Sequence, residues 1–190
     1  MKYVAYLIMI VGLVFLAYGG YEIFQSSQKQ KQSLAEANQV LAMDGDHTVE
    51  GPDSMDISDG DVIGLLKIPK LEKDLPIISG TEEEELDRGV GHYKTTVLPG
   101  QGDQVLLSGH RDSVFRGFGE LENGDQFIVE MPYGTFTYEM YDSEIVPEDD
   151  TTVIRSTAPD EILTLSTCYP FNFIGPAPDR YIIYAKPVLD

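Results

Sequence analysis

The sequence predicts a mainly β domain that follows an N-terminal transmembrane helix. No charged residue interrupts residues 3–21, and a run of about this length can cross the hydrocarbon core of a bilayer as a helix. From Asp61 onward, short runs of β-branched and aromatic residues alternate with turn residues, as in a chain of strands. The 190 residues, 42% of them hydrophobic, can bury one core, so we expect a single folded domain.

The apolar run is interpreted as an uncleaved membrane anchor over residues 1–24. The alternative is a signal peptide, because residues 17–19, Ala-Tyr-Gly, loosely fit the small-x-small cleavage pattern, but the run exceeds the usual apolar region of roughly 7 to 15 residues. Lys2 and the α-amine favour a cytoplasmic N-terminus, although Lys29 and Lys31 weaken the charge asymmetry. We expect a single-pass protein of the cell membrane whose C-terminal domain is extracellular.

Residues 25–60 are expected to form an extracellular stalk. The part up to Ala42 is rich in Gln, Ser, Ala and Lys, which are good helix formers, but it shows no strong apolar face. The remainder turns to Asp, Gly, Ser and Pro. As a flexible coil of about 35 residues, the stalk would hold the folded domain, residues 61–190, roughly 30 Å from the bilayer.

Strands are predicted wherever β-branched and aromatic residues gather between turns. The runs are VIGLLKIPKL, LPIIS, QVLLSG, QFIVEM, GTFTYEMY, ILTLSTC and RYIIYAKP. Between Phe127 and Met140, apolar residues alternate on both sides of residues 132–134, Pro-Tyr-Gly, which predicts a hairpin with one buried face.

One short helix is expected to interrupt the strands. Thr81 would cap it, the four Glu of residues 82–85 complement the positive end of a helix, and Gly89 can end it. We therefore interpret the Glu run as a solvated helix start and not as a metal site.

Charge and cysteine content exclude several classes of protein. Lys and Arg total 13 against 32 Asp and Glu, and the net charge of −19 repels phosphate backbones, so no nucleic-acid partner is expected. The single Cys excludes an internal disulfide. Outside the cytoplasm, a lone thiol must be buried and inert, paired between chains, or reactive.

Cys168 ends the apolar run ILTLSTC, and a Pro- and Gly-rich loop then leads to Arg180. If the two flanking strands are antiparallel neighbours, this loop brings Cys168 and Arg180 together at one end of the sheet. A guanidinium can favour a nearby thiolate, and its planar donors suit an oxygen that becomes negative during acyl transfer. On its own, however, a Cys at a strand end is usually a small buried hydrophobe.

A cysteine nucleophile generally needs a base or a cationic partner, and the candidate bases are His47, His92 and His110. His47 lies in the acidic stalk, and His92 follows a Gly-Val-Gly turn, where we expect a structural role. His110 ends the run QVLLSG and opens a polar turn, so its context resembles that of Cys168. The three His show no ligand spacing, and no metal site is predicted.

The segments LSGHRD around His110, TLSTCYP around Cys168 and APDRYIIYAKP around Arg180 together resemble the signature of the sortases, the cell-surface transpeptidases of Gram-positive bacteria. The resemblance extends from Ile63 to Lys186 and includes IGLLKIPKL as the first strand and the GVGHY turn. The stretches GHRDSVFR, STCYPFNFIGPAPDRY and EDDTTVI are most similar to the class D sortases of spore-forming Gram-positive bacteria.

This resemblance implies a closed eight-stranded β-barrel with one or two short helices. It implies that Cys168 is a nucleophile that cleaves an LPxTG-like sorting signal between Thr and Gly through a thioacyl intermediate. A peptidoglycan amine would then resolve the intermediate and attach the surface protein to the cell wall. His110 would act as the general acid and base, and Arg180 would position the substrate or oxyanion. No cofactor is implied; calcium stimulation, known in some relatives, stays open.

Some relatives assemble pili, and they commonly carry an Asp-Pro-aromatic lid before the barrel and often a second membrane span. Residues 42–60 contain no such triplet, and the sequence stops directly after its last strand, so we expect wall anchoring instead. The alternatives are another cell-wall cysteine transpeptidase, a membrane-anchored extracellular cysteine protease, or a non-catalytic β binding module in which Cys168 is buried.

Overall fold

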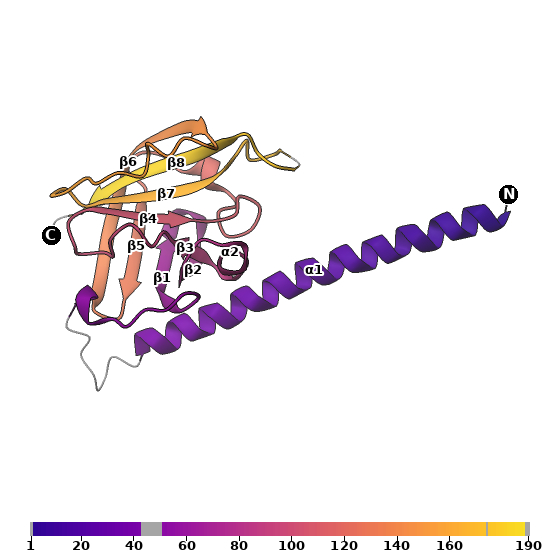
Figure 1. Cartoon of the computed structure of the whole chain (residues 1–190), viewed down its shortest axis with the longest axis horizontal. Coiled ribbons are helices and arrows are strands. Elements are labelled where there is room, and N and C mark those ends of the chain that lie inside the picture. Colours follow the sequence, from indigo (N-terminus) through magenta and orange to yellow (C-terminus); the bar gives the residue numbers. More distant parts are fainter. Residues whose placement is uncertain (1, 43–50, 174, 189–190) are drawn as a thin grey trace.

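The computed structural model describes residues 2–42, 51–173 and 175–188. It contains a closed barrel of eight strands in the order β1-β2-β3-β4-β7-β8-β6-β5, from which one long helix, α1 (Lys2–Ala42), projects (Figure 1). This confirms the closed eight-stranded barrel that the sequence resemblance implies.

The strands are β1 (Val62–Ile68), β2 (Lys73–Ser79), β3 (Val90–His92), β4 (Gln104–Ser108), β5 (Gln126–Met131), β6 (Gly134–Pro147), β7 (Ile162–Tyr169) and β8 (Asp179–Pro187). The described residues also form a short helix, α2 (Glu83–Arg88), and three single 3-10 turns, η2 (Pro52–Ser54), η3 (Pro69–Leu71) and η4 (Phe118–Glu120). Strand pairs β2–β3 and β4–β7 are parallel, and the other pairs are antiparallel.

The hairpin predicted around residues 132–134 is confirmed, because Met131 pairs with Gly134 across β5 and β6. The turn predicted in the GVGHY segment is wrong. Residues 90–92 instead form β3, which pairs with β2 on one side and β4 on the other. A three-residue strand is too short to show alternation in the sequence, so its pairing comes from its place between two longer strands.

The short predicted helix is present as α2, with Glu82 as its N-cap residue and Gly89 as its C-cap. Gly89 therefore ends the helix as predicted. The capping role of Thr81 is wrong, because the helix begins one residue later and has no side-chain cap. The first turn is still acidic, which complements the partial positive charge of a helix N-terminus.

Helix α1 continues through residues 25–42, so the flexible coil expected there is wrong. Its second half packs on the barrel: Ala37 is fully buried in a cluster with Val62, Leu65 and Ile78. Leu34 and Leu41 pack against the same cluster, and their spacing around Ala37 gives the apolar stripe that the sequence interpretation missed. Residues 43–50 lie outside the described part of the chain.

Polar contacts also fix α1 to the barrel domain. Lys29 Nζ forms an ion pair with Asp87 of α2 at 3.1 Å. Arg88 Nε donates to the buried Ser33 Oγ at 3.3 Å. The catalytic domain therefore includes part of the predicted stalk in its packing, while the boundaries 1–24, 25–60 and 61–190 stay predictions.

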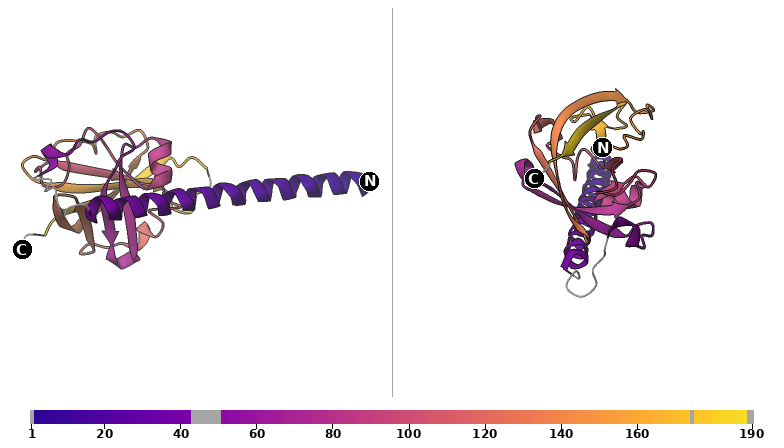
Figure 2. Two further views of the ribbon diagram at one scale, coloured as in Figure 1. Left: turned by 90° about the horizontal axis from the view of Figure 1, so that it is seen from below. Right: turned by 90° about the vertical axis from the view of Figure 1, so that its left-hand side faces the viewer.

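The first half of α1 projects away from the barrel, as Figure 1 and the left view of Figure 2 show. Its large apolar side chains among the described residues from Tyr3 to Tyr21 are exposed. Within the described residues, α1 is the one helix that is long and apolar enough to cross a membrane. This half of the helix fits a membrane anchor.

Candidate active site

A cavity of about 400 Å³ is lined by His110, Cys168 and Arg180 together. Its floor is the outer face of three neighbouring strands. The barrel core contains odd-numbered residues of each strand, namely 105 and 107 of β4, 163 and 165 of β7, and 183 of β8. Because side chains alternate along a strand, the even-numbered residues face outward. The cavity is lined by several of these: Leu106, Ser108, Ser166 and Ile182.

Cys168 and Arg180 are brought together by the pairing of β7 and β8. They are register partners in this antiparallel pair, so their side chains lie on the same face of the sheet. This confirms that the two strands are antiparallel neighbours joined by the Pro- and Gly-rich loop. The thiol of Cys168 is free and partly exposed to solvent.

His110 reaches the same cavity because β4 and β7 run in parallel and remain in step beyond their last pair, Ser108 and Ser166. The Gly109 N–H donates to the Ser166 carbonyl at 3.1 Å. In return, the buried Thr167 Oγ1 donates to the Gly109 carbonyl at 2.7 Å. His110 and Cys168 therefore each lie two residues beyond this last pair, His110 after Ser108 and Cys168 after Ser166.

A glycine precedes His110 because the turn that follows it folds back closely. A Cβ at Gly109 would come within 2.7 Å of the Val114 side chain and 2.8 Å of Phe115. Phe115 is buried, and its N–H donates to the His110 carbonyl at 3.0 Å. Lys73 Nζ donates to the Val114 carbonyl at 2.7 Å, and burial lowers the pKa of this lysine. The segment that carries His110 is thus fixed from both sides.

Arg180 is held at the rim of the cavity. Its Nη1 donates to the carbonyls of Ala177 at 3.2 Å and Asp179 at 3.0 Å. Its Nη2 lies 3.4 Å from Glu148 Oε2, and the Glu148 side chain is 55% exposed, so this ion pair contributes little to stability. Sequence reasoning missed Glu148, which the pairing of β6 with β8 brings beside Arg180.

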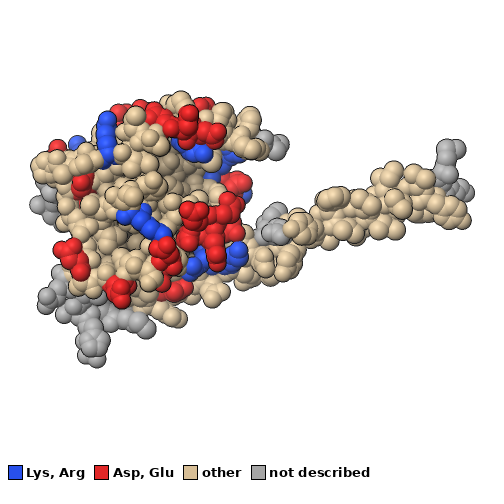
Figure 3. Space-filling model, in the orientation of Figure 1, with Lys and Arg blue, Asp and Glu red and all other residues tan. Residues whose placement is uncertain are grey.

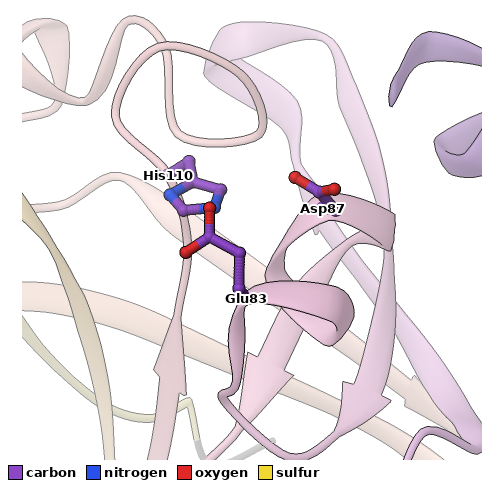
Figure 4. A group of neighbouring side chains, drawn as sticks. All are labelled: Glu83, Asp87 and His110. Carbon is purple, nitrogen blue, oxygen red and sulfur yellow. The ribbon is translucent and has the colours of Figure 1, made fainter. Parts of the chain in front are cut away.

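Two carboxylates of α2 lie on the other side of His110. Figure 4 shows Glu83 and Asp87 directed from this helix toward the imidazole, and one ligand atom from each of the three residues lies within 4.8 Å of the others. Asp87 already pairs with Lys29. We interpret this group as the charged surroundings of His110, and the expectation of no metal stays a prediction. A second cavity, of about 770 Å³, opens there between α1, α2 and His110.

Arg111, which the sequence interpretation did not single out, connects the segment of His110 to the loop that follows Cys168. Its Nη2 donates to the carbonyls of Phe173 at 2.7 Å and Gly175 at 2.8 Å, both in the loop that joins β7 to β8. The loop that leaves Cys168 is therefore bonded to the residue that follows His110. The available signal was the position of Arg111 directly beside the candidate base.

The other histidines are separate from this cavity or outside the described residues. His92 is buried, and its Nε2 donates to the Val97 carbonyl at 3.1 Å. Burial lowers the pKa of His92. These observations agree with the structural role expected for it. His47 falls within residues 43–50, outside the described part of the chain.

Comparisons with known proteins address the family directly. The model of the sortase domain matches residues 66–188. Sortase D of Bacillus subtilis (strain 168) is 42% identical over 195 residues, covering 98% of both chains. Sortase A of Bacillus anthracis is 26% identical over 87% of this chain and 85% of its own.

Solved structures of sortases also match this chain. A Clostridium perfringens Sortase D5 transpeptidase has a TM-score of 0.74 at 26% identity, covering 85% of this chain and 99% of its own. Sortase C from Clostridium perfringens SM101 has a TM-score of 0.64 at 26% identity, covering 86% and 90%. With a domain match over most of its length and a relative 42% identical from end to end, the chain belongs to the sortase family of cysteine transpeptidases.

Proposed function

We propose that this sortase cleaves an LPxTG-like sorting signal between Thr and Gly and joins the surface protein to an amine of peptidoglycan. The observation that carries the proposal is the shared cavity of His110, Cys168 and Arg180. A thiol, an imidazole and a guanidinium around one hollow are the groups that acyl transfer through a thioester requires.

In the first half-reaction, the Cys168 thiolate attacks the carbonyl carbon of the signal threonine. The carbonyl oxygen becomes an oxyanion, which then collapses as the carbon–nitrogen bond to glycine breaks. His110, as the imidazolium, gives its proton to the leaving amine. The products are a thioester on Cys168, a neutral His110 and a released peptide that begins with glycine.

In the second half-reaction, the acceptor amine attacks the thioester carbonyl. His110 takes a proton from the attacking nitrogen, and the thiolate of Cys168 leaves as the new amide forms. Cys168 is then again a thiolate and His110 again an imidazolium, as at the start of the reaction. Water that attacked in place of the amine would give hydrolysis, so the choice between water and amine decides between protease and transpeptidase.

Arg180 is proposed to hold the substrate carbonyl and to stabilise the oxyanion. Its contacts with Ala177, Asp179 and Glu148 involve Nη1 and Nη2. A guanidinium has five N–H donors, so among the described contacts it keeps donors for a substrate oxygen. A planar cation fixed by backbone carbonyls also needs little rearrangement during the reaction.

The proposed partners are surface proteins that carry a sorting signal and a peptidoglycan precursor that supplies the amine. We place the N-terminus in the cytoplasm and the catalytic domain outside the cell. The lysine at position 2 supports this orientation, and the projecting apolar half of α1 supports the membrane anchor itself.

The test is cleavage of a panel of LPxTG-type fluorogenic peptides by the full chain, with and without an added amine. We expect cleavage by the native chain, a thioester on Cys168 detectable by intact mass, and no cleavage by Cys168→Ala. Circular dichroism of Cys168→Ala checks that its fold is intact. Full activity of that variant would overturn the mechanism.

A further inference from the structure

The loop that joins β7 to β8 is described over residues 170–173 and 175–178, and this part leaves the barrel on the side from which the apolar half of α1 projects. Figure 1 shows this loop in yellow, apart from α1 but projecting from the same side of the barrel and farther than the other strands and loops, and the left view of Figure 2 agrees. The loop carries Phe173, whose side chain is 45% exposed.

A chain of contacts fixes this loop relative to α1. Residues 25–30 of α1 and the segment from His110 to Arg116 both line the 770 Å³ cavity. Within that segment, Arg111 holds the carbonyl of Phe173 and the carbonyl of Gly175. The backbone of Phe173 is therefore linked through Arg111 to the segment that faces residues 25–30 of α1, which directly follow the apolar half of the helix.

The charge of this end of the molecule permits a close approach to lipid. The whole chain has a net charge of −19, which opposes contact with anionic headgroups. The 770 Å³ cavity, however, is lined by three basic and three acidic side chains, namely Lys29, Lys73, Arg116, Glu83, Asp87 and Asp112. Figure 3 shows red and blue side chains side by side where α1 meets the barrel, while the projecting half of α1 is tan.

We propose that the β7–β8 loop contacts the membrane that α1 enters, with the Phe173 side chain among the lipid headgroups. Phe is among the apolar residues that insert into the boundary between lipid headgroups and acyl chains. A single aromatic residue binds lipid weakly, but α1 makes the contact intramolecular and so raises its effective concentration. The domain then has two points of attachment, α1 and the loop.

Because the barrel packs on α1, the loop contact adds a second attachment point that limits the tilt of the helix and the barrel relative to the bilayer. The loop runs from the end of β7 at Tyr169, the residue after Cys168, to the start of β8 at Asp179. A loop resting on the bilayer would therefore hold the cavity of Cys168 at the membrane surface. Such a cavity is suited to substrates that are themselves anchored in the same membrane.

The chain contains no tryptophan, so single-tryptophan variants report one position each. We would prepare Phe173→Trp, Phe15→Trp in the apolar half of α1, and Tyr141→Trp on β6. Tyr141 is a matched control because its side chain is 38% exposed and borders the cavity beside Pro187, at the far end of β8 from the loop. Each full-length variant is reconstituted in phosphatidylcholine vesicles with and without brominated acyl chains, which quench nearby tryptophan.

We expect strong quenching of Phe15→Trp, clear quenching with a blue-shifted emission for Phe173→Trp, and neither effect for Tyr141→Trp. Combining Phe173→Trp with Arg111→Gln should reduce the quenching at least twofold, because the loop loses its two carbonyl bonds. Emission of Phe173→Trp that matched Tyr141→Trp, with no quenching, would overturn the proposal. The readout needs no enzymatic turnover, so it is independent of the proposed transpeptidase reaction.

Discussion

Cys168 lies directly opposite Arg180 in the antiparallel pairing of β7 and β8, and both side chains line one cavity on the outer face of the barrel. The pairing of the two strands sets the distance between the backbones of these residues. The carbonyls of Ala177, in the loop, and of Asp179 then hold the guanidinium of Arg180 beside the cavity.

Arg180→Lys should lower kcat/KM for the signal peptide by about 10² to 10³, the typical effect of losing an oxyanion donor. An ammonium keeps the charge but cannot provide the planar fork of donors. Peptide cleavage kinetics measure this, with Glu148→Gln as a control that removes the exposed ion-pair partner and should change kcat/KM far less. Full activity of Arg180→Lys would assign Arg180 a structural role only.

His110→Gln should lower turnover by roughly 10² to 10⁴, the usual contribution of a general acid or base. The matched control is His92→Gln, which changes a buried histidine outside the Cys168 cavity and should retain cleavage at temperatures where it is folded. The rate of thioester formation in a single turnover is measured for both variants and compared. Equal losses in both variants would contradict a proton-transfer role for His110.

Thr167→Val should destabilise the chain by about 1 to 3 kcal/mol, because the buried Gly109 carbonyl loses its donor. The conservative change Thr167→Ser retains the hydroxyl and should recover part of this loss. Urea unfolding measures both. The same hydrogen bond connects the segments that carry His110 and Cys168, so Thr167→Val should also have a lower kcat. If both kcat and stability were unchanged, the hydrogen bond would have no role in positioning these two residues.

Most of the strands and the three candidate residues could be predicted because their signals are local. Cys168 and His110 each end an apolar run, and Arg180 opens one. Contacts between distant segments could not be predicted in this way. The bonds of Arg111 to the β7–β8 loop and of Glu148 to Arg180 depend on register and loop conformation, which a single sequence does not specify.

The length of α1 could not be predicted from the sequence either, for a different reason. Its packed stripe consists of Leu34, Ala37 and Leu41, with only two large apolar residues among many polar ones. Such a pattern is compatible with an exposed helix or a coil, and only the barrel surface against which it packs decides between them.

Removing residues 25–60 should destabilise the barrel, because the stripe of α1 covers Val62, Leu65 and Ile78. A chain of residues 25–190 is expected to exceed residues 61–190 in free energy of unfolding by about 2 to 5 kcal/mol, the cost typical of exposing or removing buried aliphatic side chains. Urea unfolding of the two chains measures the difference. Equal midpoints would show that the docking of α1 adds nothing to stability.

The stability of the domain should fall as the pH is lowered below about 6.5, the ordinary pKa of histidine, and His92 should contribute to this fall. Burial lowers the pKa of His92 in the folded state, so the unfolded chain binds a proton at a pH where the folded chain does not. Between the folded and the unfolded pKa, the unfolded state binds more protons. The free energy of unfolding therefore decreases as pH decreases through that window and is fully retained above it.

His92→Gln should remove this part of the pH dependence. Urea unfolding at pH 7.5 and 5.5 is expected to show a smaller loss of stability for His92→Gln than for the native chain, even if the variant is less stable at both values. The same loss in His92→Gln and in the native chain would contradict the contribution of His92, because burial without a protonation penalty cannot link folding to pH in this window.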